Sequence, residues 1–313
     1  MKLLLPLLIT LLFFSCKKNA EGPPKLIRKE ATTYTGVLQT TEYVYDSQNR
    51  IVAVKQGENN AAPATFVTIS YMGNEAMLIS HPTYDPAFNI TKEVRLILNG
   101  SGQLLKKTGY VYMVAKTNPL SRRSRHDTLV CEYDAAGFLK YTTWNLFDST
   151  RSDPGYTAVD QAITKDTFTT TNNNLVKKDR LLQYTRTITN GGGTTISGGS
   201  AENHSLFGYE KLYPNKTDFT NAAILNEVID YSGTMDWYEW VGYFETQPEE
   251  KYQHMPNKII TRSIERDTNG TVIFDFTSTY ECERTYDENG LLSITDITTP
   301  GTPYTSIKYF YSR

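Results

Sequence analysis

Four histidines are the first residues to consider, because imidazole is the side chain most often used for metal binding and for proton transfer near neutral pH. They are His81, His126, His204 and His254. None has a His-Glu-x-x-His or His-x-His spacing, which would bring two imidazoles to one zinc ion. His126 is followed by Asp127, but adjacent residues of a strand point to opposite faces. We therefore expect surface histidines and no metal site.

The nucleophiles and carboxylates also lack a recognisable catalytic pattern. No Gly-x-Ser-x-Gly elbow occurs, and Cys131 has no histidine partner motif. The glycine run 191–193 lacks the Lys-Ser/Thr of a phosphate-binding loop. A glycoside hydrolase needs two carboxylates across one pocket, whereas Glu281 and Glu283 alternate with apolar residues and indicate a solvated face. We expect no enzyme and no cofactor, although the acidic pair Glu249-Glu250 leaves an unrecognised hydrolase site open.

The aromatic residues Trp237, Tyr238 and Trp240 are the strongest candidates for ligand binding. Indole and phenol rings offer flat apolar faces with a polar group, which suits a sugar or a partner protein. The same rings would also serve as core that plugs one end of a sheet or barrel. The sequence does not decide between these two roles.

The N-terminus carries an export signal. Lys2 precedes an apolar run over residues 3–14, which is too short for a confident membrane span, and Ser15-Cys16 follows it. This arrangement resembles a bacterial lipoprotein signal, with Phe13 where leucine is usual. The resemblance implies that Cys16 is lipidated and becomes the first residue of the mature chain. An ordinary secretory signal that ends in cysteine is the alternative.

We therefore divide the chain into a signal peptide at residues 1–15, a flexible tether at 16–30 and a single β domain at 31–313. Pro23-Pro24 and the polar composition favour the tether. No later stretch is apolar for 18 residues, so we expect membrane contact through the lipid anchor only. The net charge of −2 and the pI near 6.1 give no indication of a nucleic-acid partner.

The rest of the chain has the composition and periodicity of antiparallel strands. It contains 22 Tyr and 13 Phe, which favour strands over helices. In residues 272–286 apolar and polar side chains alternate, as in a strand with one solvated face. Long alternating strands also fit a membrane barrel. The charged residues on the polar face instead favour water on that face and aromatics inside.

Seven polar turns lie between strand-like runs, and a last strand ends near Tyr311. Asn-Gly and related pairs accept the positive φ of tight hairpin turns. The irregular spacing of these turns argues against a strict repeat and for an up-and-down meander. The predicted turns cover residues 47–50, 73–74, 99–102, 134–137, 172–174, 267–270 and 287–290.

Two segments interrupt this pattern. Residues 190–203 are rich in Gly and Ser and predict a mobile loop. Residues 214–253 are less regular and predict an insertion with a short helix over 222–229.

Cys131 and Cys282 lie in strand-like runs, and the exported compartment permits a disulfide between them. We favour two separate buried thiols, because sequence cannot place their Cα atoms within bonding range.

The turn residues carry two resemblances. The Tyr-Asp-x-x-Gly-x-Leu pattern at 133–139 and 286–292, with a variant at 45–51, is similar to the YD repeat of Rhs-type proteins. The whole chain resembles lipoproteins of unknown function from Bacteroidota that have a porin-like fold. That resemblance rests on Cys16, the Tyr-Asp hairpins and the ending from Pro256 to Tyr311. It implies the architecture of the chain but gives no information on its activity.

These observations predict an all-β protein, an antiparallel up-and-down meander of β-hairpins curled into an open or closed barrel. The expected location is the outer membrane, facing the periplasm or the cell surface. The expected role is non-enzymatic binding of a glycan, a small apolar ligand or an envelope partner. The alternatives are an envelope hydrolase with an unrecognised site and a purely structural surface protein.

Overall fold

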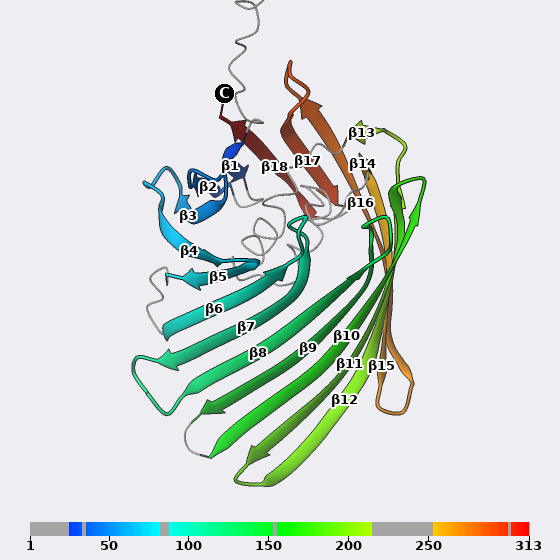
Figure 1. The fold of residues 1–313 in the computed structure, drawn as a ribbon. Coiled ribbons are helices and arrows are strands. Elements are labelled where there is room, and N and C mark those ends of the chain that lie inside the picture. Colours follow the sequence, from blue (N-terminus) through cyan, green and yellow to red (C-terminus); the bar gives the residue numbers. More distant parts are fainter. Residues whose placement is uncertain are drawn as a thin grey trace, which may run out of the picture.

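A computed structural model describes residues 25–32, 36–81, 88–152, 155–214, 253–299 and 302–312. In this part of the chain the regular elements are strands, and sixteen of them form one closed antiparallel barrel (Figure 1). Strands β13 (Tyr213–Pro214) and β14 (His254–Met255) form a separate two-stranded sheet.

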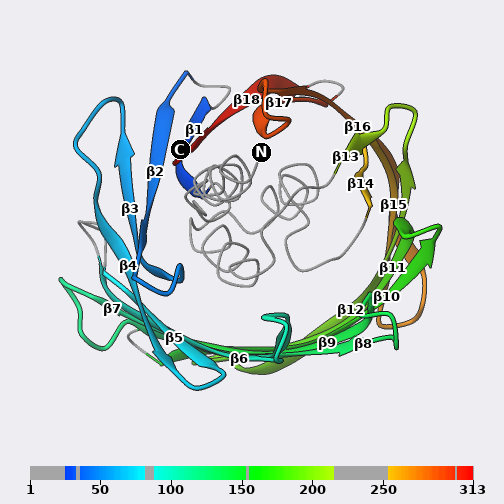
Figure 2. The same cartoon turned by 45° about the horizontal axis from the view of Figure 1, so that its top comes forward.

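The sixteen barrel strands follow one another around the ring in chain order (Figure 2). They are β1 (Leu26–Thr32), β2 (Leu38–Tyr45), β3 (Ile51–Glu58), β4 (Ala64–Met72), β5 (Glu75–Ser80), β6 (Phe88–Leu98), β7 (Leu104–Ala115), β8 (Arg122–Tyr133), β9 (Leu139–Ser152), β10 (Tyr156–Thr171), β11 (Asn174–Asn190), β12 (Gly193–Gly208), β15 (Lys258–Asp267), β16 (Val272–Tyr286), β17 (Leu292–Thr299) and β18 (Thr302–Tyr311).

The predicted meander is confirmed, and the barrel is closed. Each strand pairs with its neighbour in sequence, except that β12 pairs directly with β15 across the insertion. The first and last strands close the ring through pairs such as Ala31 with Ile307 and Lys29 with Tyr309. Closure removes the free edges that an open sheet of this size would carry.

The seven predicted turns all connect paired strands, and five of them share one geometry. In the last of these turns, the Oδ1 atom of Asp287 accepts the backbone N–H groups of Asn289 (2.9 Å) and Leu291 (2.8 Å). Gly290 takes a φ of +72°, which glycine adopts without strain. The carboxylate or amide oxygens of Asp46, Asn99, Asp134 and Asp267 accept the equivalent pairs of N–H groups.

Four tyrosines at this end of the barrel donate a hydrogen bond to the backbone of an earlier strand. The Tyr133 hydroxyl donates to the carbonyl oxygen of Leu104 at 2.9 Å, and the Tyr45 hydroxyl donates to that of Leu26 at 2.7 Å. Tyr71 and Tyr209 make the same kind of bond with Ile51 and Leu175. The tyrosine of the repeated pattern is thus both a packing residue and a cross-link between strands.

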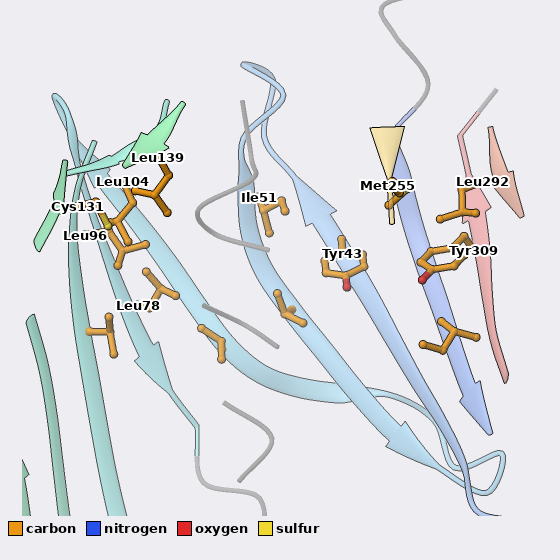
Figure 3. Close-up of a cluster of buried hydrophobic side chains, with 14 of the residues drawn as sticks. Tyr43, Ile51, Leu78, Leu96, Leu104, Cys131, Leu139, Met255, Leu292 and Tyr309 are labelled. Carbon is orange, nitrogen blue, oxygen red and sulfur yellow. The ribbon is translucent and has the colours of Figure 1, made fainter. Parts of the chain in front are cut away.

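One face of the sheet carries a single core that runs around the ring at the turn end (Figure 3). These side chains share one face of the closed ring, and their burial assigns that face to the inside of the barrel. The opposite face, reached by every second residue, points outward. The fully buried members are Ile51, Val54, Val67, Leu78, Val94, Leu96, Leu175, Ile259 and Ile307.

The prediction of a mobile loop at residues 190–203 is wrong. Only Gly191 and Gly192 form a turn, and the following residues belong to β12, which pairs with β11 and β15. A Cβ atom on Gly198 would lie 2.6 Å from the carbonyl oxygen of Tyr184, and one on Gly199 would lie 2.4 Å from that of Arg266. These glycines allow close approach of neighbouring strands, whereas their composition indicated flexibility.

The tether also ends earlier than expected. Residues 26–30, which the sequence assigned to it, belong to β1 and pair with both β18 and β2. Alternation is weak in this stretch, because Arg28, Lys29 and Glu30 interrupt it. The pairing with two neighbouring strands, which a local pattern does not contain, makes it a strand.

Cys131 and Cys282 are buried and do not form a disulfide, as expected for separate thiols. Both side chains lie on the inner face with the tyrosines that follow them. Burial raises the pKa of the Cys282 thiol to about 12. The thiol therefore stays protonated and behaves as a small core residue.

The strands have two lengths, which divide the barrel into two parts (Figure 1). We call β1–β5, β17 and β18 the collar; these strands have six to ten residues. We call β6–β12, β15 and β16 the apron; these strands have ten to seventeen residues. The apron strands extend beyond the collar at the end opposite to the tyrosine-linked turns.

The turn geometry predicts that Gly290→Val destabilises the barrel. A β-branched residue at a positive φ costs at least about 1–2 kcal/mol. We expect the midpoint of thermal unfolding to fall by a few degrees, measured by circular dichroism. Gly100→Val is the matched control, because Gly100 occupies a turn of the same type without a positive φ, and an added Cβ there would meet no atom within 4 Å. Equal melting temperatures for the two variants would contradict this account of the turn.

Candidate functional site

The residues that the sequence singled out for function lie outside the described part of the chain. These are the lipidation candidate Cys16 and the aromatic residues Trp237, Tyr238 and Trp240. The acidic pair Glu249-Glu250 and the expected helix at 222–229 lie outside it as well. Their roles remain predictions. The candidate site in the described part of the chain consists of other residues.

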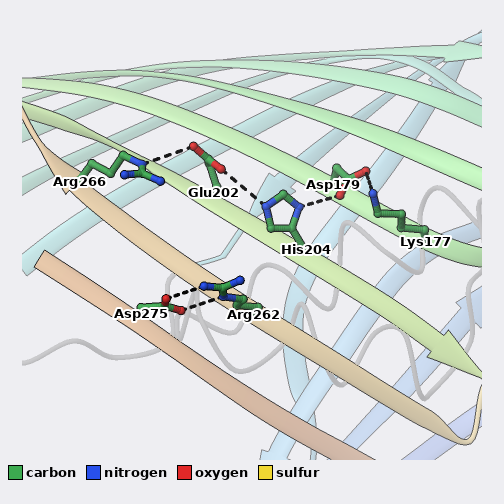
Figure 4. Close-up of polar contacts among 7 residues, drawn as sticks. All are labelled: Lys177, Asp179, Glu202, His204, Arg262, Arg266 and Asp275. Carbon is green, nitrogen blue, oxygen red and sulfur yellow. Dashed lines mark hydrogen bonds and ion pairs between the residues drawn. The ribbon is translucent and has the colours of Figure 1, made fainter. Parts of the chain in front are cut away.

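The histidines of the described chain do not form a metal site. No group of three His, Cys, Asp or Glu side chains suited to a metal ion occurs among the described residues. His204 lies on the outer face between two carboxylates, 2.7 Å from Asp179 and 3.6 Å from Glu202 (Figure 4). Lys177 lies 2.7 Å from Asp179 and Arg266 lies 3.7 Å from Glu202, so each carboxylate of this row also has a basic neighbour.

The same row explains the acidity of Asp179. Partial burial raises the pKa of this carboxyl group, but hydrogen bonds from His204 and Lys177 outweigh it and hold the pKa below its usual value. The carboxylate is therefore ionised at neutral pH and engaged by its neighbours. Such a group is suited to holding strands together, and it is a poor proton donor for catalysis.

Other outward carboxylates are also paired. Asp275 makes two hydrogen bonds with Arg262, of 2.9 Å and 2.7 Å (Figure 4). Glu281 lies 3.0 Å from Lys258, and Glu283 contacts Lys211. Both glutamates are exposed, which confirms the solvated face that the sequence indicated.

A band of buried ion pairs crosses the inner face of β7–β11 beside the core. Asp166 lies 2.8 Å from Arg180 and 3.2 Å from Lys178. Asp148 accepts hydrogen bonds of 2.9 Å from Arg123. Buried charges of this kind are retained only when they are paired, because desolvation is costly.

One member of this band depends on a glycine. Asp127 accepts a hydrogen bond of 3.1 Å from the indole N–H of Trp144 and lies 3.9 Å from Lys107. It is paired across the strands with Gly109, whose added Cβ would lie 2.0 Å from Asp127 Oδ1. The missing side chain at Gly109 thus provides the space in which the Asp127 carboxylate lies.

A shallow groove on the outer face of the apron is the best candidate for ligand binding. It has a volume of about 950 Å³ and crosses five neighbouring strands, β8 to β12. The turn between β15 and β16, at residues 267–270, lines one side of it. Its outward side chains include Asn145, Phe147, Gln161, Ile163, Gln183 and Thr185.

The strand register brings these side chains into two rows. Phe147, Gln161 and Thr185 are directly paired across β9, β10 and β11. Asn145, Ile163 and Gln183 form the next row on the same strands. Each amide therefore neighbours an apolar or threonine side chain both along and across the strands, and neighbouring strands are about 4.8 Å apart.

The amides of the groove are available to a ligand. Within the described ranges, the side-chain amides of Asn145, Gln161 and Gln183 have no hydrogen-bond partner, and all three residues are exposed. Each amide offers an acceptor oxygen and two N–H donors. The one carboxylate in the lining, Asp267, holds its own turn through the N–H groups of Asn269 and Thr271. The groove therefore offers neutral donors and acceptors beside apolar surface.

Sequence reasoning missed this site although its signal was present. Gln161, Ile163 and Lys165 share one parity of β10, and Ala162 and Thr164 share the other. The alternation identified a polar face, but it did not show which neighbouring strands would extend the row. Only the register across β8–β12 brings the three amides together.

The inner band generates a prediction about Gly109→Ala. The new methyl group would displace the Asp127 carboxylate from Lys107 and Trp144, so we expect a loss of about 3 kcal/mol, the scale for a broken buried ion pair. Thermal unfolding measures this loss. Gly191→Ala, where the added Cβ has open space, should have little effect.

A double-mutant cycle separates this cause from general crowding. In an Asp127→Ala background, the methyl group at position 109 meets no carboxylate. We therefore expect Gly109→Ala to add almost nothing there. Fully additive losses would show that the methyl group acts on something other than Asp127.

Comparison with known proteins does not identify the family of the chain. No family model and no curated protein sequence matches it. Two solved structures similar to it are porin-like proteins from Bacteroides vulgatus and Bacteroides uniformis, each 12% identical in sequence. The first has a TM-score of 0.46, with 92% of this chain and 98% of that protein covered. The second has a TM-score of 0.48, with 93% and 98% covered.

Similarity at this level gives no information on activity, ligand or location.

Among the described residues, no helix has the length and hydropathy needed to cross a membrane.

Proposed function

We propose that this chain is a non-enzymatic, lipid-anchored protein of the cell envelope whose outer groove binds a neutral glycan. The observation that carries this proposal is the set of exposed, unpartnered amides at Asn145, Gln161 and Gln183, placed beside Phe147 and Ile163.

A polyhydroxylated ligand fits this combination of side chains. A sugar ring presents adjacent hydroxyl groups that both donate and accept, as a side-chain amide does. Its C–H face is apolar and can lie against a side chain such as Phe147. Five adjacent strands span about 19 Å at the usual spacing, which is long enough for several sugar rings in a row.

The charge distribution favours a neutral ligand. The free amides carry no charge, and the carboxylate of Asp267 is engaged by its own turn. Charged outward residues outside the groove, such as Glu202 and Arg266, interact with each other. A strongly charged ligand would find no counter-charge to compensate for its desolvation.

The state of the described carboxylates supports a non-enzymatic role. A hydrolase of the usual two-carboxylate type needs one acid and one base that face the same substrate. Asp127, Asp148 and Asp166 of the inner band are each engaged by a cation or an N–H donor. The groove itself supplies only Asp267.

The anchor would orient the groove. If Cys16 carries the lipid, residues 17–25 separate it from β1 and reach at most about 30 Å when extended. Leu26 lies at the turn end of the barrel, where Tyr45 bonds its carbonyl oxygen. The apron, with the groove, then points away from the membrane surface and towards ligands in solution.

The anchor predicts that Cys16→Ala moves the protein from the membrane fraction to the soluble fraction. Without lipid chains the polar chain has no strong membrane affinity. Fractionation followed by immunoblotting measures this, with Lys17→Ala as a control that should remain in the membrane fraction. A Cys16→Ala protein that stays with membranes would contradict lipidation as the anchor.

The groove predicts selective loss of glycan binding. A screen of the protein on a glycan array, followed by calorimetry, should find a neutral oligosaccharide ligand. Gln161→Glu and Gln183→Glu keep the side-chain shape, remove two donors and add a charge. We expect each to weaken binding at least about tenfold, or about 1.4 kcal/mol.

The control for these variants is Thr167→Ala, which lies on the same outer face of β10 but outside the groove. It should bind as the native protein does. Absence of any glycan ligand would refute the ligand class. Undiminished binding in both glutamate variants would place the ligand elsewhere.

A further inference from the structure

Strand β16 is paired along only part of one edge. On one side β15 pairs with it from Val272 to Glu281. On the other side β17 pairs only from Glu281 to Tyr286. Residues 272–280 therefore have no strand partner on that edge within the described part of the chain. Their backbone N–H and C=O groups form a template for one more strand.

The same nine residues expose an apolar surface. The exposed fractions are 46% for Val272, 59% for Ile273, 49% for Phe274 and 54% for Phe276. The rings of Phe274 and Phe276 lie together on the inner face, with centroids 6.1 Å apart. Val272 pairs with Arg266, whose side chain points outward, and Ile273 is the extra residue of a bulge between Val272 and Phe274. An added strand would thus cover apolar side chains on both faces of the sheet.

The edge lacks most of the usual protections against pairing, and its one bulge lies near its end, at Ile273. Natural edge strands carry lysine, proline or inward-pointing charges that prevent association. Residues 272–280 contain no Lys, Arg or Pro, and their single charge is Asp275. Arg262 of the neighbouring strand already pairs with that carboxylate. The edge is therefore open and electrically neutral.

We propose that this edge pairs with the same edge of a second copy of the chain, antiparallel and centred on Phe276. Antiparallel self-pairing about Phe276 uses the regular part of the edge, residues 274–278, in which Phe274 faces Ser278 of the second copy, and the bulge at Ile273 lies beyond it. Phe276 faces itself and Asp275 faces Thr277, so no like charges are opposed. Centring one residue earlier would place two Asp275 carboxylates opposite each other, which is unfavourable.

A second copy fits this edge better than an unrelated strand for two reasons. The edge is self-complementary in charge and length, as a two-fold symmetric contact requires. The buried area is also appropriate for such a contact. Four half-exposed side chains of about 100 Å² each, in two copies, give on the order of 800 Å². Backbone pairing adds to this, so we expect a concentration-dependent dimer near the lower limit for specific interfaces.

Cysteine cross-linking tests the register. In full-length protein, Phe276→Cys places two thiols opposite each other across the two-fold axis, so mild oxidation should give a disulfide-linked dimer on a non-reducing gel. Thr279→Cys is the matched control on the same edge, because its two copies would lie about 20 Å apart. The native chain, with Cys131 and Cys282 buried, sets the background.

Light scattering on the full chain in detergent tests the association itself. The native protein should be a dimer at high concentration, and Ile273→Lys should be a monomer with an unchanged melting temperature. Leu206→Lys is the control, since Leu206 is 52% exposed on the outer face of β12, away from this edge. A native protein that is monomeric at every concentration refutes the proposal. Equal cross-linking at positions 276 and 279, or an Ile273→Lys dimer, also refutes it.

Discussion

Closure of the backbone hydrogen-bond network is the constraint on which the rest of this structure depends. Sixteen strands in a meander leave two free edges, and the pairing of β1 with β18 removes them. Once the ring is closed, every second side chain points inward and every other one outward. Closure also fixes which strands are neighbours, so that rows of side chains such as the groove amides form across several hairpins.

The turn end and the opposite end then have different chemistry. At the turn end, Asx-type turns and tyrosine hydroxyls lock the hairpins to one another, and a continuous apolar core faces inward. Beside that core, buried carboxylates are each matched to a cation, as Asp166 is to Arg180. This matching keeps the wall polar without leaving isolated buried charges. A barrel of sixteen strands is also too wide for its own wall side chains to fill.

The fold was largely predictable from the sequence, whereas the candidate site was not. Alternation and turn residues identified the seven hairpins, because both signals are local. The strand at 193–208 was missed, since Gly198 and Gly199 are determined by contacts with β11 and β15 that no local pattern records. The groove was missed for the same reason: Gln161 and Gln183 are twenty-two residues apart, and only the register places them on adjacent strands.

Most of the hydrogen-bonding capacity described in this barrel is used to hold it together. The charged rows are paired, Cys131 and Cys282 are buried, and the turn carboxylates bind their own backbones. Two features of the apron stand apart, namely the amides of the groove and the open edge of β16. Neither contributes to closure or to the core, and both lie where the longer strands extend beyond the collar. Stability does not account for these two features. We therefore expect the apron to be the part of the barrel that recognises a ligand or a partner.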